Sequence, residues 1–236
     1  MVFDIDGTRE AARQRALPQT EELPPAFRRL DKVCAAGYTG RKRGEVVRTR
    51  TVVSQAHNYQ WLGSFGNRGN GLYRKELRRA LSAIGRYLAA RQLPQERALL
   101  RLDGQYGTGA VLADLAGFSF VMRGKEYAVL DHPLVQARLH LPPDQLQRRP
   151  ESSLVRSLYD CPDVPVGSQG IPCRVVVATH PADKKKSSVG VTRAGVVYEL
   201  FFTNLPQRAF TASDVVELYL HRGAVDPAVG SQYAAV

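Results

Sequence analysis

The chain has 236 residues, of which 44% are hydrophobic and 23% charged, a composition that excludes a disordered protein and suffices for one large folded domain. Lys and Arg outnumber Asp and Glu by 33 to 22, and the net charge of +11 is typical of a protein that binds a polyanion such as DNA. The three cysteines lack CxxC spacing and no apolar run could span a membrane, so we expect a cytoplasmic protein without disulfides, a zinc site or a membrane partner.

The first part of the chain predicts a strand, a loop, a hairpin and a helix. Residues 2–5 alternate between apolar and polar positions, as in a strand. Residues 8–44 are polar and interrupted by proline and glycine, so we expect a long loop with at most short helices. Residues 45–65 contain two β-rich runs that predict an antiparallel hairpin. Residues 73–92 repeat leucine and isoleucine at helical spacing, with Arg and Lys on the other surface, and predict an amphipathic basic helix.

The rest of the chain predicts further strands with helical cover. Residues 97–122 read as a strand, a helix and a strand, which indicates a mixed sheet. Residues 126–200 hold many prolines and several β-like segments but no long helix, and we interpret them as a β-rich insertion. Residues 201–204 then form another strand, and the capping sequence of residues 211–214 predicts the start of a final helix.

Two aspartates each end a predicted apolar strand and precede a glycine. Asp6 ends the first strand, and Asp103 ends the strand that begins near residue 97. The glycine allows a sharp turn that leaves the carboxylate at the edge of the sheet. Divalent-metal phosphoryl transfer needs carboxylates from separate elements, because two hard cations must clamp one phosphate. Asp6 and Asp103 are therefore candidate metal ligands, although a strand-terminal Asp-Gly is also a common turn.

Four short blocks occur in a characteristic order along the chain. They are Phe3-Asp-Ile-Asp-Gly-Thr, Tyr38-Thr-Gly-Arg-Lys-Arg-Gly-Glu, Leu102-Asp-Gly-Gln-Tyr-Gly and Phe202-Thr-Asn-Leu-Pro. In this order they resemble successive blocks of DDE transposases of bacterial insertion sequences, in the insertion-sequence-four-like group. The resemblance covers residues 2–226, and the combination of blocks is more specific than any one of them.

The resemblance implies an α/β (α+β) fold, an RNase H-like mixed sheet with flanking helices that is interrupted by a β-rich insertion. Residues 1–124 would be the first part of the catalytic domain, and residues 125–200 the insertion. Residues 201–226 would supply the last strand and the helix of the third acid, and residues 227–236 an atypical tail. Compared with the family pattern the chain is expected to be truncated at both ends, so that its activity is impaired.

The resemblance also implies a catalytic triad of acids that binds two Mg²⁺ or Mn²⁺ ions and serves DNA cleavage and strand transfer. Carried over to this chain, the three acids are Asp6, Asp103 and Asp226. The family signature around the third acid is matched by Tyr219 and Arg222. Asp226, however, stands in place of the family's glutamate, and the basic residue expected further along is missing.

The predicted partner is DNA, specifically the terminal inverted repeats of an insertion sequence, on which a homo-oligomer would assemble. Tyr219 and Arg222 are expected to contact this DNA as part of the family signature. Arg41, Lys42 and Arg43 are candidates for phosphate contacts, although a solvated basic loop accounts for them equally well.

Two other functions stay open at this stage. The N-terminal block also resembles the first motif of haloacid-dehalogenase-like phosphatases, in which Asp4 would be the nucleophile and Asp6 the acid/base. The second acidic block that such an enzyme needs is not found in the sequence. Alternatively the chain is a non-catalytic basic remnant that binds DNA through Lys and Arg and lacks a competent metal site.

Overall fold

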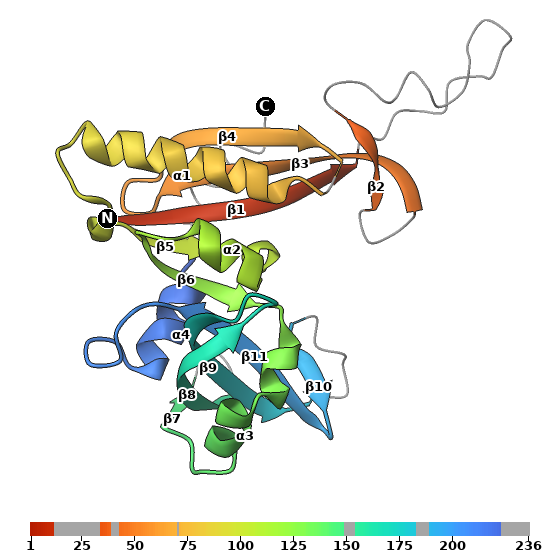
Figure 1. Ribbon diagram of the computed structural model, residues 1–236, viewed down its shortest axis with the longest axis vertical. Coiled ribbons are helices and arrows are strands. Elements are labelled where there is room, and N and C mark those ends of the chain that lie inside the picture. Colours follow the sequence, from red (N-terminus) through yellow and green to blue (C-terminus); the bar gives the residue numbers. More distant parts are fainter. Residues whose placement is uncertain (12–33, 39–42, 70, 149–153, 183–188, 223–236) are drawn as a thin grey trace, which may run out of the picture. The chain divides into compact units, whose positions relative to one another are not determined.

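The computed structural model describes residues 1–11, 34–38, 43–69, 71–148, 154–182 and 189–222 (Figure 1). These residues form a mixed α/β protein, as the sequence predicts. The chain divides into two compact units, which are described separately. We call Ile5–Pro94 the N-terminal unit, and Met1–Asp4 together with Gln95–Val236 the C-terminal unit. Among the helices in the described ranges, none combines the length and the apolar character needed to cross a membrane.

The N-terminal unit is built around the strand β3 (Arg43–Gln55). β3 pairs antiparallel with β2 (Ala35–Tyr38) and with β4 (Gln60–Arg68). The strand β1 (Val2–Ala11), whose first residues belong to the other unit, follows β3 in the order of the sheet. The helix α1 (Tyr73–Ala89) packs on β3 and β4 (Figure 1). The predicted hairpin and the predicted helix are therefore confirmed.

One face of α1 is buried against these strands. Its apolar side chains on this face are Leu77, Leu81, Ile84 and Leu88. Glu76 lies on the same side and is fully buried. Its carboxylate accepts hydrogen bonds from the Thr49 hydroxyl, from the Thr51 hydroxyl at 2.9 Å and from the Asn67 side-chain amide at 3.2 Å. Because a buried carboxylate is stable only when it has such partners, these bonds fix the position of α1 on the hairpin.

The strand β1 is longer than the sequence predicts, since it continues beyond residue 5 to Ala11. Glu10 shows the reason, because its carboxylate lies 2.5 Å from the Arg48 guanidinium and 3.5 Å from that of Arg50, both on β3. Cross-strand pairing therefore outweighs the polar composition of this stretch. The expectation of a loop over residues 8–44 was wrong at both ends, where β1 and β2 form.

The C-terminal unit contains a mixed sheet in the order β5-β6-β11-β9-β8-β7. β5 and β6 run parallel, whereas every other neighbouring pair in this order is antiparallel. The start of the chain lies beside β5, since the Leu99 amide donates to the Met1 carbonyl at 2.8 Å. The strands are β5 (Leu99–Leu102), β6 (Ser119–Gly124), β7 (Gln145–Arg148), β8 (Val155–Val166), β9 (Ile171–Pro181) and β11 (Val196–Thr203), with β10 (Val191–Arg193) paired to β11.

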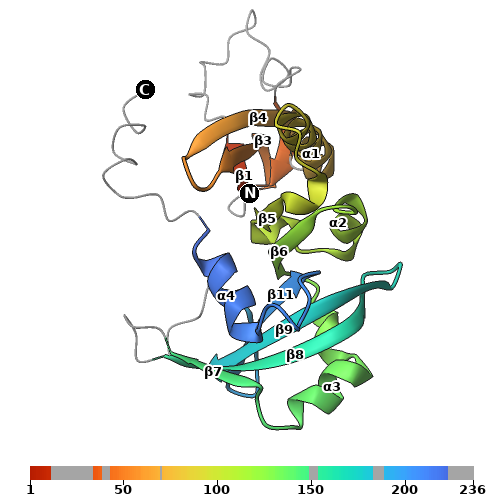
Figure 2. The ribbon, with the colours of Figure 1, turned by 90° about the vertical axis from the view of Figure 1, so that its left-hand side faces the viewer.

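Helices lie on both faces of this sheet, and Figure 2 shows α3 and α4 on opposite sides of β8 and β9. The α-helices are α2 (Gly109–Asp114), which connects β5 to β6, α3 (Pro133–Leu139) and α4 (Ala212–Leu220). Short 3-10 helices occur at η2 (Gln95–Arg97), η3 (Gly104–Tyr106) and η4 (Tyr127–Asp131). The strand, helix and strand predicted for residues 97–122 are confirmed.

α4 begins with the capping arrangement that the sequence predicts. The Thr211 hydroxyl accepts a hydrogen bond from the Asp214 amide at 3.2 Å, and the Asp214 carboxylate accepts one from the Thr211 amide at 2.8 Å. The helix ends at Leu220. Its buried side chains, Ala212, Val215, Val216 and Tyr219, share one hydrophobic cluster with Val121, Leu158, Val176, Ala178 and Phe201 of the sheet. This packing positions the end of α4 over the sheet.

The strand β11 crosses the expected boundary between insertion and catalytic domain. It runs without a break from Val196 to Thr203 and pairs along that length with β9. Its residues from Leu200 onward also pair with β6. A boundary at residue 200 therefore falls inside one strand, because the segment predicted as insertion and the segment predicted as last strand are one element.

Candidate active site

Asp103 lies immediately after β5, at the start of η3. Its carboxylate accepts a hydrogen bond from the Gln105 amide at 3.3 Å, and its side chain is 28% exposed. The loop that follows lies tightly against β6, since a Cβ atom at Gly107 would stand 1.9 Å from the Arg123 carbonyl oxygen. The Lys125 amide also donates to the Gly107 carbonyl at 2.8 Å. Asp103 is thus a partly exposed carboxylate on a firmly held turn, as the sequence predicts.

Tyr219 and Arg222, at the end of α4, lie close to Asp103. The Tyr219 ring is 7% exposed and packs edge-on against Phe201, with ring centroids 5.3 Å apart. The Arg222 guanidinium lies 5.5 Å from the centroid of the Tyr219 ring, and its Nη2 atom lies 4.0 Å from the Asp103 Oδ1 atom. Three of the residues predicted for the site therefore meet within the C-terminal unit.

Arg123, on β6, belongs to the same cluster, although its sequence context did not indicate it. Its guanidinium lies 5.2 Å from the centroid of the Tyr219 ring, so the guanidinium groups of both Arg123 and Arg222 contact this ring. Its Nη2 atom lies 3.6 Å from Glu199, which is 3% exposed and also pairs with Arg156 at 3.0 Å. Nε of Arg123 and Nη1 of Arg156 are buried, and neither has a hydrogen-bond partner within the described residues. The signal in the sequence that could have indicated Arg123 is its position as a charged residue at the end of an apolar strand.

Asp4 takes part in a structural ion pair. Its two carboxylate oxygens accept hydrogen bonds from Arg101 Nε at 2.7 Å and Nη2 at 2.9 Å. Arg101 Nη1 also donates to the carbonyl of Leu218, in α4, at 3.3 Å. This bidentate arrangement joins the first strand to the last helix, and it engages the carboxylate that a phosphatase of the haloacid-dehalogenase type would use as nucleophile.

None of the remaining predicted residues lies beside Asp103 among the described residues of the C-terminal unit. Asp6 is exposed and lies inside β1 rather than at its end, in the N-terminal unit, so the prediction of a strand-terminal position was wrong. Arg43 begins β3. Arg41, Lys42 and Asp226 lie outside the described residues.

The described residues do not by themselves form a metal site. Among them, no three His, Cys, Asp or Glu side chains gather as metal ligands would. Asp103 pairs with Arg222, a cation, at 4.0 Å, whereas a two-metal site requires further carboxylates there. The residues shown therefore do not fit a two-metal clamp, which would need Asp6 and Asp226 as well.

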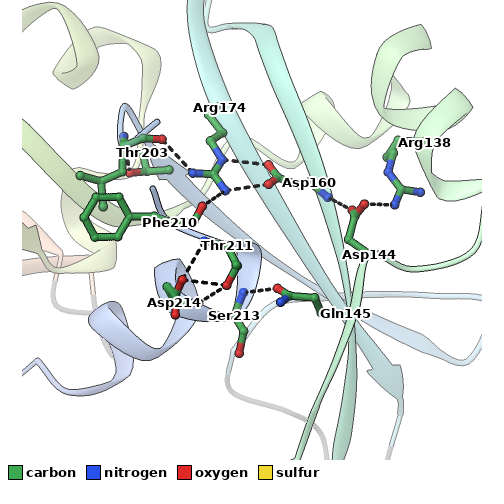
Figure 3. Close-up of polar contacts among 11 residues, drawn as sticks. Arg138, Asp144, Gln145, Asp160, Arg174, Thr203, Phe210, Thr211, Ser213 and Asp214 are labelled. Atoms are coloured by element: carbon green, nitrogen blue, oxygen red, sulfur yellow. Dashed lines mark hydrogen bonds and ion pairs between the residues drawn. The ribbon is translucent and has the colours of Figure 1, made fainter. Parts of the chain in front are cut away.

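A polar network holds the start of α4 on the sheet (Figure 3). Arg174, on β9, donates to the two carboxylate oxygens of Asp160 at 2.9 and 2.6 Å. It also donates to the carbonyls of Leu205 and Phe210, both at 2.8 Å, in the segment that leads into α4. Nearby the Ser213 amide, in the first turn of α4, donates to the Gln145 side chain at 2.7 Å. These contacts fix one end of α4, and the helix then delivers Tyr219 and Arg222 at its other end.

A hollow of about 460 Å³ opens elsewhere on the C-terminal unit, between α2, the β8–β9 strands and residues 203–207. Its walls are largely apolar, and Asp103, Tyr219 and Arg222 do not line it. Asn204, a polar lining residue, is fixed by hydrogen bonds to the backbone of Phe118 and Phe120. The hollow is therefore separate from the cluster around Asp103.

Compared with models of known protein families, the sequence matches none, and no curated protein matches it. A functional assignment for this chain therefore depends on its motifs and on the geometry of its residues.

Proposed function

We propose that the chain is part of a DDE transposase, which binds DNA and takes part in metal-dependent phosphodiester cleavage and strand transfer. One observation carries the proposal. Asp103, Tyr219 and Arg222 were selected because they match separate motifs of that family, and more than a hundred residues of sequence lie between the first and the other two. In the structure, all three lie in one cluster, with Arg222 4.0 Å from Asp103.

The order of elements along the chain also supports an RNase H-like catalytic domain. Asp6 lies in β1, Asp103 follows β5, and a β-rich stretch separates Asp103 from α4. Within the C-terminal unit, β5 and β6 are parallel and α2 connects them. The carboxyl end of such a parallel strand is where α/β proteins place residues that act on a ligand.

In this proposal Asp103 would hold Mg²⁺ or Mn²⁺ together with Asp6 and Asp226, and the metal would supply Lewis-acid chemistry at a phosphodiester. Of these carboxylates, Asp226 lies outside the described residues and Asp6 lies in the N-terminal unit. The contribution of the described residues is positioning and charge. Arg222 and Arg123 would face the phosphates of DNA, in the proposed homo-oligomer assembled on two DNA ends.

Nicking of a supercoiled plasmid in Mn²⁺ tests this proposal. We expect the full chain to nick slowly and the Asp103→Asn variant to show no nicking, since asparagine keeps the shape of the side chain but loses the metal-binding charge. Glu96→Gln is the matched control, because Glu96 is an exposed carboxylate of the same unit, on η2. If Asp103→Asn nicks as fast as the original chain, the assignment of Asp103 is wrong.

A second candidate function is supported by the absence, within the described residues, of three potential metal-binding side chains gathered in one place. A non-catalytic remnant of the same family would keep the DNA-binding surfaces and lack a complete metal site. It would bind DNA in a salt-dependent manner and show no nicking in either Mg²⁺ or Mn²⁺. The phosphatase function is disfavoured, because Asp4 is engaged by Arg101.

A further inference from the structure

The excess positive charge of the protein lies entirely in the N-terminal unit. Residues 5–94 contain 18 Lys and Arg against 7 Asp and Glu, which gives +11. The rest of the chain contains 15 of each and is neutral. The candidate active site around Asp103 therefore lies in a unit without net charge. A surface that attracts a polyanion is expected on the N-terminal unit.

The helix α1 gathers part of this charge on one exposed stripe, which we call the α1 stripe. Its members are the exposed residues Lys75, Arg78, Arg79 and Arg86. Successive positions of a helix are 100° apart, so these four lie within about a third of its circumference. The stripe is about 16 Å long, since the helix rises 1.5 Å per residue. Glu76, the acidic residue of α1, lies outside the stripe and is fully buried against β3 and β4.

Arg79 is oriented by the strand beneath it. Its Nη1 atom donates to the Gly66 carbonyl at 3.3 Å, and its guanidinium lies 5.4 Å from the centroid of the Phe65 ring. Beyond the end of the helix, Arg91 stacks on Tyr87 at 3.7 Å, and the Tyr87 hydroxyl donates to Gln60. A guanidinium that is already oriented loses less side-chain entropy when it meets a phosphate.

A stripe of one sign costs stability in the isolated protein. Lys75 is followed by like charges three and four positions on, and such pairs repel on a helix. Lys75 also lies in the first turn, where the helix dipole disfavours a cation. An ordinary solvated helix face mixes both signs, whereas this stripe has one sign, and a bound anion would reduce the repulsion between its members.

We propose that the α1 stripe docks the phosphate backbone of duplex DNA. The choice of DNA among polyanions rests on the proposed function, whereas the location of the surface rests on the charge distribution alone. A lipid surface is disfavoured, because a membrane-bound amphipathic helix inserts its apolar face. In α1 that face, which includes Leu77 and Ile84, is already buried against β3 and β4.

The test is duplex DNA binding by fluorescence anisotropy across a series of salt concentrations, with EDTA present so that no metal contributes. The variant is the triple substitution Lys75→Gln, Arg78→Gln and Arg86→Gln in the full chain. Glutamine keeps helix propensity high, and Arg79 is left unchanged because it contacts Gly66 and Phe65. Each lost phosphate contact lowers the slope of log affinity against log salt by about 0.9, so we expect a loss of up to about 2.7.

A matched control separates a local surface from net charge. The triple substitution Arg97→Gln, Arg148→Gln and Arg208→Gln removes the same charge from exposed positions of the neutral unit. It should leave the slope nearly unchanged, and the charge-retaining set Lys75→Arg, Arg78→Lys and Arg86→Lys should bind like the original chain. The far-ultraviolet circular dichroism of every variant must match that of the original.

The inference is overturned if the α1 variant keeps the original salt slope, or if both neutralised variants lower that slope equally. It is also overturned if the chain binds anionic lipid vesicles or RNA but not duplex DNA. Failure of the proposed function gives a different result. In that case the original chain binds DNA through the α1 stripe but never nicks it. If nicking depends on Asp103 and the α1 variant binds normally, the proposed function stands and this inference fails.

Discussion

The two units use arginine in opposite ways. In the C-terminal unit Arg101, Arg156 and Arg174 are at most 8% exposed, and each pairs with a carboxylate of Asp4, Glu199 or Asp160. In the N-terminal unit the basic side chains of the α1 stripe lie on the surface, in a part of the chain where basic residues greatly outnumber acidic ones. The comparison shows that the same side chain is buried in ion pairs in one unit and exposed in the other, where we propose that it meets a ligand. Its burial and the carboxylates around it decide which.

The largest effect is expected from removing a buried arginine. Arg174→Ala leaves the carboxylate of Asp160, which is only 12% exposed, without its bidentate partner, and it also removes the donor to the carbonyls of Leu205 and Phe210. We expect the free energy of unfolding to fall by about 3–5 kcal/mol. Urea unfolding followed by circular dichroism measures it. Arg208→Ala, at an exposed position of the same unit, should change it by about 0.5 kcal/mol or less. Equal effects of the two substitutions would contradict the division between structural and surface arginines.

A smaller loss in the free energy of unfolding is expected when Glu76, the buried acid of the N-terminal unit, is replaced. Glu76→Ala leaves the donors of Thr49, Thr51 and Asn67 without their acceptor, at roughly 1–3 kcal/mol for each donor that water cannot reach. We expect about 2 kcal/mol or more in the same urea experiment. Glu10→Ala is the control, because its ion pairs with Arg48 and Arg50 are partly exposed and contribute about 1 kcal/mol at most. If Glu76→Ala is as mild as Glu10→Ala, the buried carboxylate does not hold α1 in place.

The smallest perturbation is chemical labelling of the cysteines, which leaves the sequence unchanged. Burial raises the pKa of Cys161 and of Cys173 to about 12, with the nearby Asp160 carboxylate adding to the rise at Cys161. Because the thiolate is the reactive form, a raised pKa keeps both thiols inert until the pH approaches that value. Cys34, in the N-terminal unit, is half-buried.

We therefore expect a thiol-specific disulfide reagent at pH 8 to modify Cys34 first and the other two only after unfolding. Rapid modification of all three in the folded protein would show that the C-terminal core is more open than described. In urea all three should react, which provides the internal control.

Local signals in the sequence were sufficient for much of the fold. The hairpin of residues 45–65, the helix α1 and the capping box of α4 were all predictable, because each depends on residues close to one another in the chain. The extension of β1 to Ala11 was not predictable, since it depends on ion pairs between Glu10 and a strand nearly forty residues away.

The candidate site was predictable to a similar extent. Asp103 was selected from a strand-terminal Asp-Gly, and Tyr219 and Arg222 from the signature of the family that the chain resembles. Arg123 was missed, because only the folded sheet brings β6 beneath Tyr219. Asp4 is a candidate nucleophile by its motif, but its carboxylate is paired with Arg101, almost a hundred residues further along the chain. Long-range pairing of charges is what sequence patterns do not reveal.

We propose that DNA docking and phosphodiester chemistry depend on different parts of the protein, the α1 stripe and the cluster around Asp103. The most direct test is the affinity of the Asp103→Asn variant for duplex DNA, measured by anisotropy across a range of salt concentrations. We predict that this variant has the affinity and salt slope of the original chain. Binding that is slightly tighter also agrees with the proposal, because the variant has lost one negative charge. A loss of affinity as large as that of the triple α1 variant would contradict the claim, since one surface would then serve both roles.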